Sequence, residues 1–327
     1  MVDFKVMTWN VENLYPVGSE FGPTTKKVYD QKQAHLAQRI RDIDVDVIAL
    51  QEIGSQQTFL DLQAGLGGNY PHAELSPQPD GRGIRVGFLS KLPLSNVQSI
   101  SNFPDGGLSL TPRAIGSSAT DPANTPLNAM GRGALKVTAT LSNGTTINLI
   151  TTHLKSKLIS YPPDANGKQR FQPKDEDERA RFTGLALLKR TVEALALRVH
   201  ANDLTVGATP PCILLGDLND GPEALTTQIL LGPPGGQINP SPNSNQSNDS
   251  RLHNLANRIP EERRFSRITD GRKELIDHIL VSIELVFMRR EVDSFVEDIG
   301  SIGANPASRR NAVVPDHAPV FARFEIP

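Results

Sequence analysis

Several apolar runs in this chain carry polar side chains at one end, and no other feature constrains the fold as strongly. The runs "VDVIALQEI" and "CILLGDLND" have the length and composition of buried strands. The first carries Glu52 near its end, and the second ends with Asp217 and Asn219. In mixed α/β architectures, ligands bind where strand ends converge. We therefore expect a sheet-based fold whose strand ends meet at one polar site.

Four more segments repeat this pattern. Asn10 follows the strand in "MTWNVEN", and His153 ends "LITTH". Asp277 lies inside the apolar "ELIDHILVS", and "VPDH" places Asp316 and His317 before the last strand. An unpaired carboxylate is costly to bury, so Asp277 requires a partner, and His317 can be that partner if the C-terminal loop folds back. Taken singly, the other polar residues could equally be turn residues or exposed strand tips.

Strands and helices alternate along the chain before strands dominate. Apolar side chains at helical spacing predict helices over Lys32–Ile43 and Glu178–His200. The dipeptide Asn143-Gly144, between Leu135–Leu141 and Thr145–Thr152, predicts a β-hairpin. Further strands are predicted at Phe4–Trp9, in "GIRVGFLSKLPL" and over residues 320–326.

Three polar stretches, residues 102–131, 156–178 and 232–250, interrupt these elements. Each could be a domain linker. Strands on both sides of them carry the same kind of polar end, so we interpret them as loops within one domain that spans residues 1–327. Long loops in compact domains are often binding loops or lids.

Composition excludes several classes of protein. The 34 Lys and Arg against 36 Asp and Glu give a net charge of −2, which argues against an avid, nonspecific nucleic-acid binder but leaves room for a local basic groove. Cys212 is the one cysteine, so an intramolecular disulfide and a cysteine-built zinc site are excluded, and its apolar surroundings predict a buried thiol. Nothing indicates an obligate protein partner.

The N-terminal residues show no signal-peptide pattern, and no apolar run approaches the ~20 residues of a membrane span. We expect a cytoplasmic protein, although the mature form of a secreted protein would look the same.

The polar residues jointly supply what hydrolysis of a phosphate ester requires. Mg²⁺ prefers a few carboxylate or amide oxygens, which Glu52, Asn10 and Asp316 offer; Mn²⁺ or Ca²⁺ are alternatives. His317, held by Asp277, suits a general base that takes a proton from water.

Three further residues complete this set. Asp217 and Asn219 would orient the attacking water and the phosphate. His153 would stabilise the pentacoordinate phosphorus by hydrogen-bond donation.

The segments "WNVEN", "IALQEIG", "TTHLKS", "LLGDLND", "LIDHILVS" and "PDHAPVFARF" stand in an order and at a spacing that resembles the endonuclease/exonuclease/phosphatase superfamily. That group includes DNase I, exonuclease III, neutral sphingomyelinases and inositol polyphosphate 5-phosphatases. The matching segments span residues 9–324. The resemblance implies a DNase I-like α/β fold, a four-layer sandwich of two packed mixed β-sheets flanked by helices.

The resemblance implies the same roles for the polar residues. By position they resemble the family's N-terminal Asn, metal-binding Glu, catalytic His, Asp-x-Asn pair, Asp–His couple and the Asp that precedes its His: Asn10, Glu52, His153, Asp217, Asn219, Asp277, His317 and Asp316. An acidic residue two positions beyond the Asn is sometimes a metal ligand in relatives, but this chain could use Asn13 in place of Glu12. His278 would point to the opposite strand face from Asp277, which indicates a structural role.

The segment "TTHLKS" resembles the histidine branch of the family, whereas the exonuclease III branch carries a Tyr-bearing strand end there. This lowers the expectation of abasic-site endonuclease activity. The histidine branch covers DNA, RNA, phosphoinositides and sphingolipids, so the fold leaves the substrate open. We expect a nuclease first, with a phosphodiesterase or phosphatase on a small molecule, phosphoinositide or lipid headgroup as the alternative. An inactive binding module is a third and minor alternative.

Basic residues near the expected site favour the nuclease. Lys155 and Lys157 follow His153, and "RIPEERRFSR" contains four arginines among glutamates, although both groups could be solvated surfaces. Arg85 and Arg132 could reach substrate phosphate or could be surface strand residues. The remaining histidines are expected at the surface: His35, His72, His200 and His253.

Overall fold

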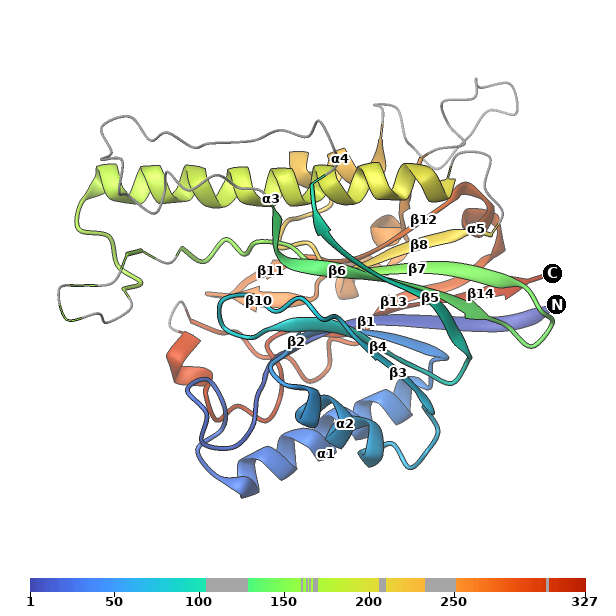
Figure 1. Ribbon diagram of the computed structural model, residues 1–327, viewed down its shortest axis with the longest axis horizontal. Coiled ribbons are helices and arrows are strands. Elements are labelled where there is room, and N and C mark those ends of the chain that lie inside the picture. Colours follow the sequence, from blue (N-terminus) through green and yellow to red (C-terminus); the bar gives the residue numbers. More distant parts are fainter. Residues whose placement is uncertain are drawn as a thin grey trace.

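A computed structural model describes residues 1–103, 129–159, 161, 162, 164, 166, 170–205, 210–232, 251–303 and 306–327. Within these residues the strands form two six-stranded sheets and one two-stranded hairpin. Both large sheets are mixed, because β1 pairs in parallel with β2, and β7 with β8, while their other pairings are antiparallel. Figure 1 shows the two sheets stacked in the middle of the molecule with helices outside them.

The first sheet joins both ends of the described chain. Its order is β13 (Arg289–Ser294), β14 (Val320–Ile326), β1 (Val2–Leu14), β2 (Val47–Ile53), β4 (Arg85–Ser90) and β3 (His72–Leu75). The second sheet has the order β5 (Leu94–Asn102), β6 (Ala129–Thr140), β7 (Thr146–His153), β8 (Cys212–Asp217), β12 (Asp277–Val281) and β9 (His253–Asn254). The short hairpin consists of β10 (Arg267–Thr269) and β11 (Arg272–Glu274).

Helices cover the outer face of each sheet, which gives the four layers seen in Figure 1. The first sheet is covered by α1 (Lys26–Ile43) and α2 (Gln56–Gly65), and the second by α3 (Glu176–Thr205) and α4 (Leu225–Leu231). The shorter elements are α5 (Ile283–Met288) and the 3-10 turns η3 (Leu255–Arg258), η4 (Glu261–Arg263) and η5 (Pro306–Arg309). The sequence-based expectation of a four-layer sandwich is confirmed.

Alternation of side chains along each strand builds a core on both faces of a sheet. In β1, Phe4 and Val6 point into the core between the sheets, and Met7 and Trp9 point into the core beneath α1 and α2. The same alternation puts Asn10 on the face that packs against the second sheet. The inner face of β1 is therefore apolar along most of its length and polar at its end.

The expected elements are present, and β1, β6, α1 and α3 are longer than their apolar patterns. The single strand expected in "GIRVGFLSKLPL" was wrong, because that segment holds β4 and the start of β5, which lie in different sheets. α1 begins at Lys26 because Thr25 caps it, its hydroxyl accepting from the Val28 N–H at 3.3 Å. The first six residues of α1 carry no buried side chain, so they lie outside its apolar stripe. The expected hairpin is β6 and β7, joined through Asn143-Gly144, where Gly144 has φ +84°.

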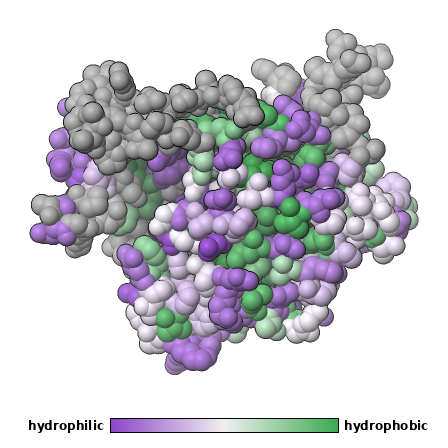
Figure 2. Space-filling model, in the orientation of Figure 1, coloured by the Kyte–Doolittle hydropathy of each residue, from purple (hydrophilic) through white to green (hydrophobic). Residues whose placement is uncertain are grey.

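The interpretation of three polar stretches as loops falls largely outside the described residues. Only residues at the margins of 102–131 and 232–250 are described, together with part of 156–178. No helix of the described chain is long and apolar enough to cross a membrane. On the face shown in Figure 2, hydrophobic residues gather in a band across the middle and hydrophilic residues lie around it.

The neighbouring strands β7 and β8 approach each other closely at Gly216. A Cβ atom built on Gly216 would lie 2.0 Å from the Thr152 carbonyl oxygen, a backbone atom held by the sheet. We expect Gly216→Ala to lower the free energy of unfolding by about 3 kcal/mol, because β8 must move away from β7. Chemical denaturation of the purified variant measures this change.

The matched control is Gly184→Ala in α3, where an added Cβ meets no atom within 4 Å. That change should leave stability unchanged or raise it by up to about 1 kcal/mol, since alanine favours helix over glycine. Equal stabilities for the two variants would contradict the close approach of β7 and β8.

Candidate active site

The polar ends of five strands meet at one end of the space between the two sheets. The first sheet contributes Asn10 from β1 and Glu52 from β2. The second contributes His153 from the end of β7, Asp217 from the end of β8 and Asp277 from the start of β12. These strands are neighbours, because β7 pairs with β8 and β8 with β12, with His153 opposite Asp217 and Asp217 opposite Asp277.

His317 reaches this group from the segment just before β14. Its Nδ1 lies 2.7 Å from Asp277 Oδ2, and both residues are buried. Trp9 fixes the backbone there, because its indole N–H donates to the His317 carbonyl oxygen at 2.9 Å. The partner that the sequence requires for Asp277 is therefore His317. The contact leaves Nε2 of His317 directed toward Asp217 Oδ2, at 3.9 Å.

Asp217 is the residue to which most of the others connect. Its Oδ2 accepts from Asn10 Nδ2 at 3.0 Å and lies 3.3 Å from His153 Nε2. Its Oδ1 accepts from the backbone N–H of Asn219 at 2.8 Å. The side-chain amide of Asn219 donates in turn to the Leu154 carbonyl oxygen at 3.0 Å. The structure thus brings these sequence-predicted residues into one hydrogen-bonded group.

Burial and crowded carboxylates shift the proton affinities in this group. Burial, followed by the charge of Asp277, raises the pKa of Asp217 to about 6. Burial would lower the pKa of His317, but the carboxylates of Asp277, Asp316 and Asp217 outweigh it and raise the value to about 10. Burial, aided by cations that include Arg132, holds the pKa of His153 well below 6.5, so this imidazole is neutral near pH 7.

Oxygen atoms that could hold a divalent cation converge at the same place. Glu52 Oε2 accepts from the Asn13 N–H at 2.8 Å, and Glu52 Oε1 lies 3.4 Å from Asn10 Nδ2. In the described part of the chain, the ligand atoms of Asp217, Asp277 and His317 also lie within 4.8 Å of one another. Asp277 Oδ1 is buried without a hydrogen-bond partner. Carboxylate-rich, cysteine-free surroundings fit a hard cation such as Mg²⁺.

Asp316 lies beside this group in a different environment. Its Oδ2 pairs with Arg267 Nη2 at 3.1 Å, and its backbone N–H donates to Glu12 Oε2 at 3.1 Å. Glu12 is held by Arg309, whose Nε and Nη2 donate to its two carboxylate oxygens at 2.5 and 2.7 Å. Lys32 donates to the Glu12 carbonyl oxygen. Both oxygens of Glu12 are thus occupied, whereas Asp316 would have to be shared between a cation and Arg267.

The backbone is unusual at four of these positions. Glu12, Asn13, Glu52 and Asn219 have φ values of +48°, +51°, +65° and +54°. Residues other than glycine rarely adopt this left-handed conformation, which costs roughly 1–3 kcal/mol and clusters at functional sites. At Glu52 it ends the regular alternation of β2.

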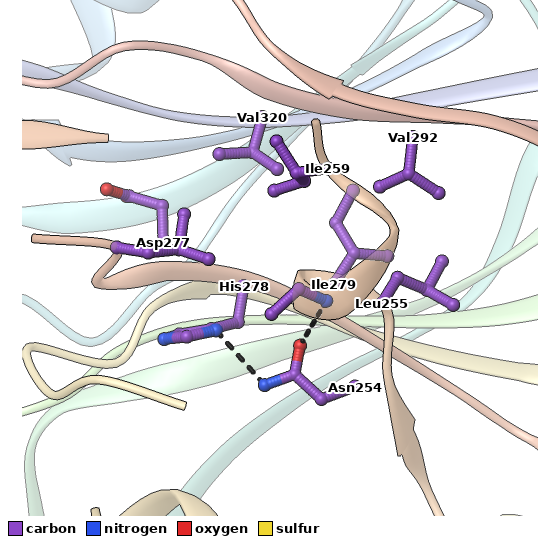
Figure 3. Close-up of a pocket in the computed structure, with 10 residues that line it drawn as sticks. Asn254, Leu255, Ile259, Asp277, His278, Ile279, Val292 and Val320 are labelled. Carbon is purple, nitrogen blue, oxygen red and sulfur yellow. Dashed lines mark hydrogen bonds between the residues drawn. The ribbon is translucent and has the colours of Figure 1, made fainter. Parts of the chain in front are cut away.

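His278, the neighbour of Asp277, points away from the site as expected. Figure 3 shows its ring directed toward Asn254, on the other side of β12 from the Asp277 carboxylate. Its Nδ1 lies 3.2 Å from Asn254 Nδ2, and its Nε2 lies 2.8 Å from the Asp220 carbonyl oxygen. The expectation of a surface position was wrong for His253, which is buried on the short edge strand β9.

The candidate phosphate-binding residues occupy two environments. Arg132 donates to Asp80 Oδ2 at 3.1 Å and to the Leu154 carbonyl oxygen at 3.0 Å. It lines a cavity of about 790 Å³ together with Lys155. Arg85, at the start of β4, donates to the Gly83 carbonyl oxygen at 3.2 Å and is not part of the lining. Arg132 and Lys155 therefore lie where a substrate at His153 would extend, and Arg85 does not.

Sequence reasoning missed the cations that hold Glu12. Arg309 lies in a polar segment 297 positions from Glu12, so no local sequence pattern indicates their contact. Lys32 carried a signal, because it occupies the apolar stripe of α1 with Leu36 and Ile40. A lysine at a buried helical position requires an acceptor, and that requirement could have indicated the Glu12 segment.

Comparisons with known proteins agree with this arrangement. The family model described as "Endonuclease/Exonuclease/phosphatase family" matches residues 7–297. A comparison with curated proteins gives no match.

Solved structures resemble the whole described fold. An endonuclease/exonuclease/phosphatase from Bacteroides vulgatus is similar with a TM-score of 0.57 at 13% identity, over 100% of both chains. Truncated TDP2 from Caenorhabditis elegans has a TM-score of 0.57 at 15% identity, over 99% of this chain and 98% of that chain. The human Nocturnin catalytic domain with bound sulfate anion has a TM-score of 0.56 at 15% identity, over 99% and 95%. Likeness at these identities shows the fold alone.

The buried His278 should make stability depend on pH. Burial lowers its pKa below the value of 6.5 in the unfolded chain, so below pH 6.5 the unfolded state binds a proton that the folded state does not. Stability must therefore fall as pH falls below 6.5, by up to about 1.4 kcal/mol per pH unit for this residue. We expect His278→Gln to be less stable at pH 8 yet to lose less stability between pH 7 and pH 5, measured by denaturant unfolding. Parallel curves for the two proteins would contradict this.

Removing one partner of the Glu12–Arg309 pair should destabilise the protein. Arg309→Met leaves a buried carboxylate without its cation, so we expect the free energy of unfolding to fall by roughly 2–3 kcal/mol. The double variant Glu12→Gln with Arg309→Met removes the uncompensated charge and should recover part of this loss. A double-mutant cycle by denaturant unfolding measures the coupling, and strictly additive effects would argue against the pair.

Proposed function

This chain belongs to the endonuclease/exonuclease/phosphatase family, and we propose that it is a divalent-metal-dependent hydrolase that cleaves phosphodiester bonds of nucleic acid. The observation that supports the proposal most directly is the contact of 2.7 Å between His317 and Asp277. Both residues are buried beside Asp217, among the polar strand ends. A histidine oriented by a buried carboxylate is the arrangement that a general base requires.

His317 would accept the proton of the attacking water. Its Nδ1 faces Asp277, so Nε2 is the atom left to face a water molecule bound near Asp217. The imidazole must be neutral before it accepts a proton, whereas the surrounding carboxylates raise its pKa to about 10. Positive charge bound near these carboxylates would lower that value toward neutrality.

Glu52 and Asn10 would hold the divalent cation, Asn10 through its Oδ1, which also accepts from the Glu12 N–H at 2.9 Å. Asp316 would be a further oxygen, shared with Arg267. When bound, Mg²⁺ or a similar cation would neutralise negative charge on the phosphate and on the carboxylates. The protein contributes the position of Glu52, which the Asn13 N–H fixes at 2.8 Å.

The remaining residues would hold the phosphate during in-line attack. The neutral His153 carries one N–H, which could donate to a phosphoryl oxygen as charge builds on it. Asp217 would orient the water and Asn219 would support Asp217 through its backbone N–H. No covalent intermediate is required, because water attacks phosphorus directly and the leaving oxygen takes its proton from solvent.

Loss of the base should nearly abolish activity. We expect His317→Ala and Asp277→Asn to reduce hydrolysis by about 10²–10⁴-fold, the usual contribution of general acid–base catalysis. The measurement is cleavage of single-stranded and supercoiled DNA, and of RNA, with Mg²⁺, Mn²⁺ or excess EDTA. His200→Ala, in α3 away from the site, is the matched histidine control and should retain activity.

Melting temperatures of all three variants would show whether loss of activity follows loss of fold. Cleavage that EDTA abolishes, and that both site variants lose while folded, would support the proposal. Equal cleavage by His317→Ala and the unmodified protein would overturn the assignment of the base. Absence of nucleic-acid cleavage together with metal-dependent hydrolysis of inositol phosphates or lipid headgroups would replace the nuclease with the alternative substrate class.

A further inference from the structure

The cavity of about 790 Å³ adjoins the candidate active site along two of its walls. Asn13, whose N–H holds Glu52, lines it on one side. Lys155 and Arg132 line it on the other, where Arg132 donates to the carbonyl oxygens of His153 and Leu154. Whatever occupies this cavity therefore lies beside the position of the phosphate that would be cleaved.

Two of the three acidic residues that line the cavity are bound by its walls, and the third, Glu20, is exposed. Asp80 pairs with Arg132 at 3.1 Å. Glu193 of α3 accepts from the backbone N–H groups of Gly131 at 2.9 Å and of Lys155 at 2.7 Å. These two carboxylates hold the walls together, and the five lining cations outnumber the three lining carboxylates.

Three of the lining cations, Lys155, Lys189 and Arg310, have no carboxylate partner in the described part of the chain. The Lys155 ammonium donates only to oxygens of its own segment, at 2.9 Å to the Ser156 carbonyl and at 2.8 Å to the Leu158 carbonyl, besides the Ser156 hydroxyl. Lys189 of α3 lines the cavity without an ion pair among the described residues. A partly buried ammonium gains from an anion that replaces its lost hydration, so phosphate groups suit this lining.

Three phenylalanines share the cavity with these cations: Phe21, Phe103 and Phe171. Phe171 is 45% exposed, so its ring is open to a ligand in the cavity. The Arg82 guanidinium lies 5.6 Å from the centroid of the Phe21 ring. Rings interleaved with cations are the surface on which proteins bind unpaired bases, the ring stacking on the base and the cation holding the phosphate.

We propose that this cavity binds one or two unpaired nucleotides next to the scissile phosphate, which makes single-stranded nucleic acid the preferred substrate; this inference rests on the proposed nuclease function. A base in a continuous duplex has both faces stacked and cannot offer one to a ring in this cavity. The volume lies within the range of about 300–1,000 Å³ typical of cavities that enclose small ligands. A lipid headgroup could use the cations but has no planar group for the phenylalanines.

Binding to a short oligonucleotide tests the proposal without relying on turnover. The probe is a fluorescein-labelled single strand of ten nucleotides with non-hydrolysable phosphorothioate linkages, compared with a hairpin duplex of the same composition and with inositol hexakisphosphate. Fluorescence anisotropy is measured on the full chain with Ca²⁺ and with EDTA. We expect the single strand to bind at least about tenfold more tightly than the duplex.

Four variants, two in the cavity lining and two matched controls outside it, test whether the single strand binds in the cavity. Phe171→Ala and Lys189→Ala should each weaken single-strand binding by about five- to tenfold and raise KM more than they change kcat. Phe287→Ala on α5, where the ring is 66% exposed, and Lys174→Ala in the segment before α3 lie outside the cavity lining and should leave binding unchanged. All four side chains are partly or fully exposed, so loss of fold is not expected.

The outcomes separate this inference from the proposed function. Equal affinity for duplex and single strand, or equal binding by the lining variants and their controls, would overturn the cavity assignment even if metal-dependent cleavage is observed. Tighter competition by inositol hexakisphosphate that depends on Lys189 but not on Phe171 would overturn it in favour of a headgroup. Single-strand binding that depends on Phe171, without metal-dependent cleavage, would support the cavity and count against the nuclease.

Discussion

The face-to-face packing of the two sheets decides where a polar site can form in this protein. Inward-pointing side chains such as Val6 and Leu215 fill the space between the sheets, and the period of two along each strand fixes which residues belong to that row. At one end the same row continues with Asn10, Asp217 and Asp277, which are buried. The buried carboxylates therefore require partners, and the polar side chains next to them supply these. The hydrogen-bonded group follows from that requirement.

The charge of this group matters as much as its geometry. Carboxylates outnumber cations around His317 and raise its pKa, while burial, followed by the charge of Asp277, raises the pKa of Asp217. Such an excess of buried negative charge costs stability unless positive charge arrives, and a divalent cation with a phosphate ligand would bring it. Positive φ angles at Glu52 and Asn219 are a second local cost at the same place. Both costs are expected where a fold is held ready for a ligand rather than optimised for stability.

Local patterns predicted the strands and their polar ends, because side-chain alternation acts within a few residues. The cost of burying a charge predicted that Asp277 needs a partner, and His317 is that partner. Contacts across the chain were less accessible. Arg309 meets Glu12 across 297 positions, and its neighbours give no periodic signal. His253 is buried because the edge strand β9 pairs with β12. β9 has only two residues, which is too short to show alternation. The cavity could not be predicted, since its walls come from several loops, the start of β6 and the middle of α3.

The cavity and the candidate catalytic residues are mechanically connected, and this has a consequence for specificity. Glu193 of α3 holds the backbone N–H of Lys155, two residues beyond His153, while Arg190 one turn earlier donates to the Lys155 carbonyl oxygen at 2.9 Å. α3 thus fixes the segment that leaves β7, and that segment carries both His153 and the cavity lining. A ligand that displaces this wall would also shift His153. Changes in the residues that directly follow His153 can therefore alter the substrate, but they act on the position of the phosphate at the same time.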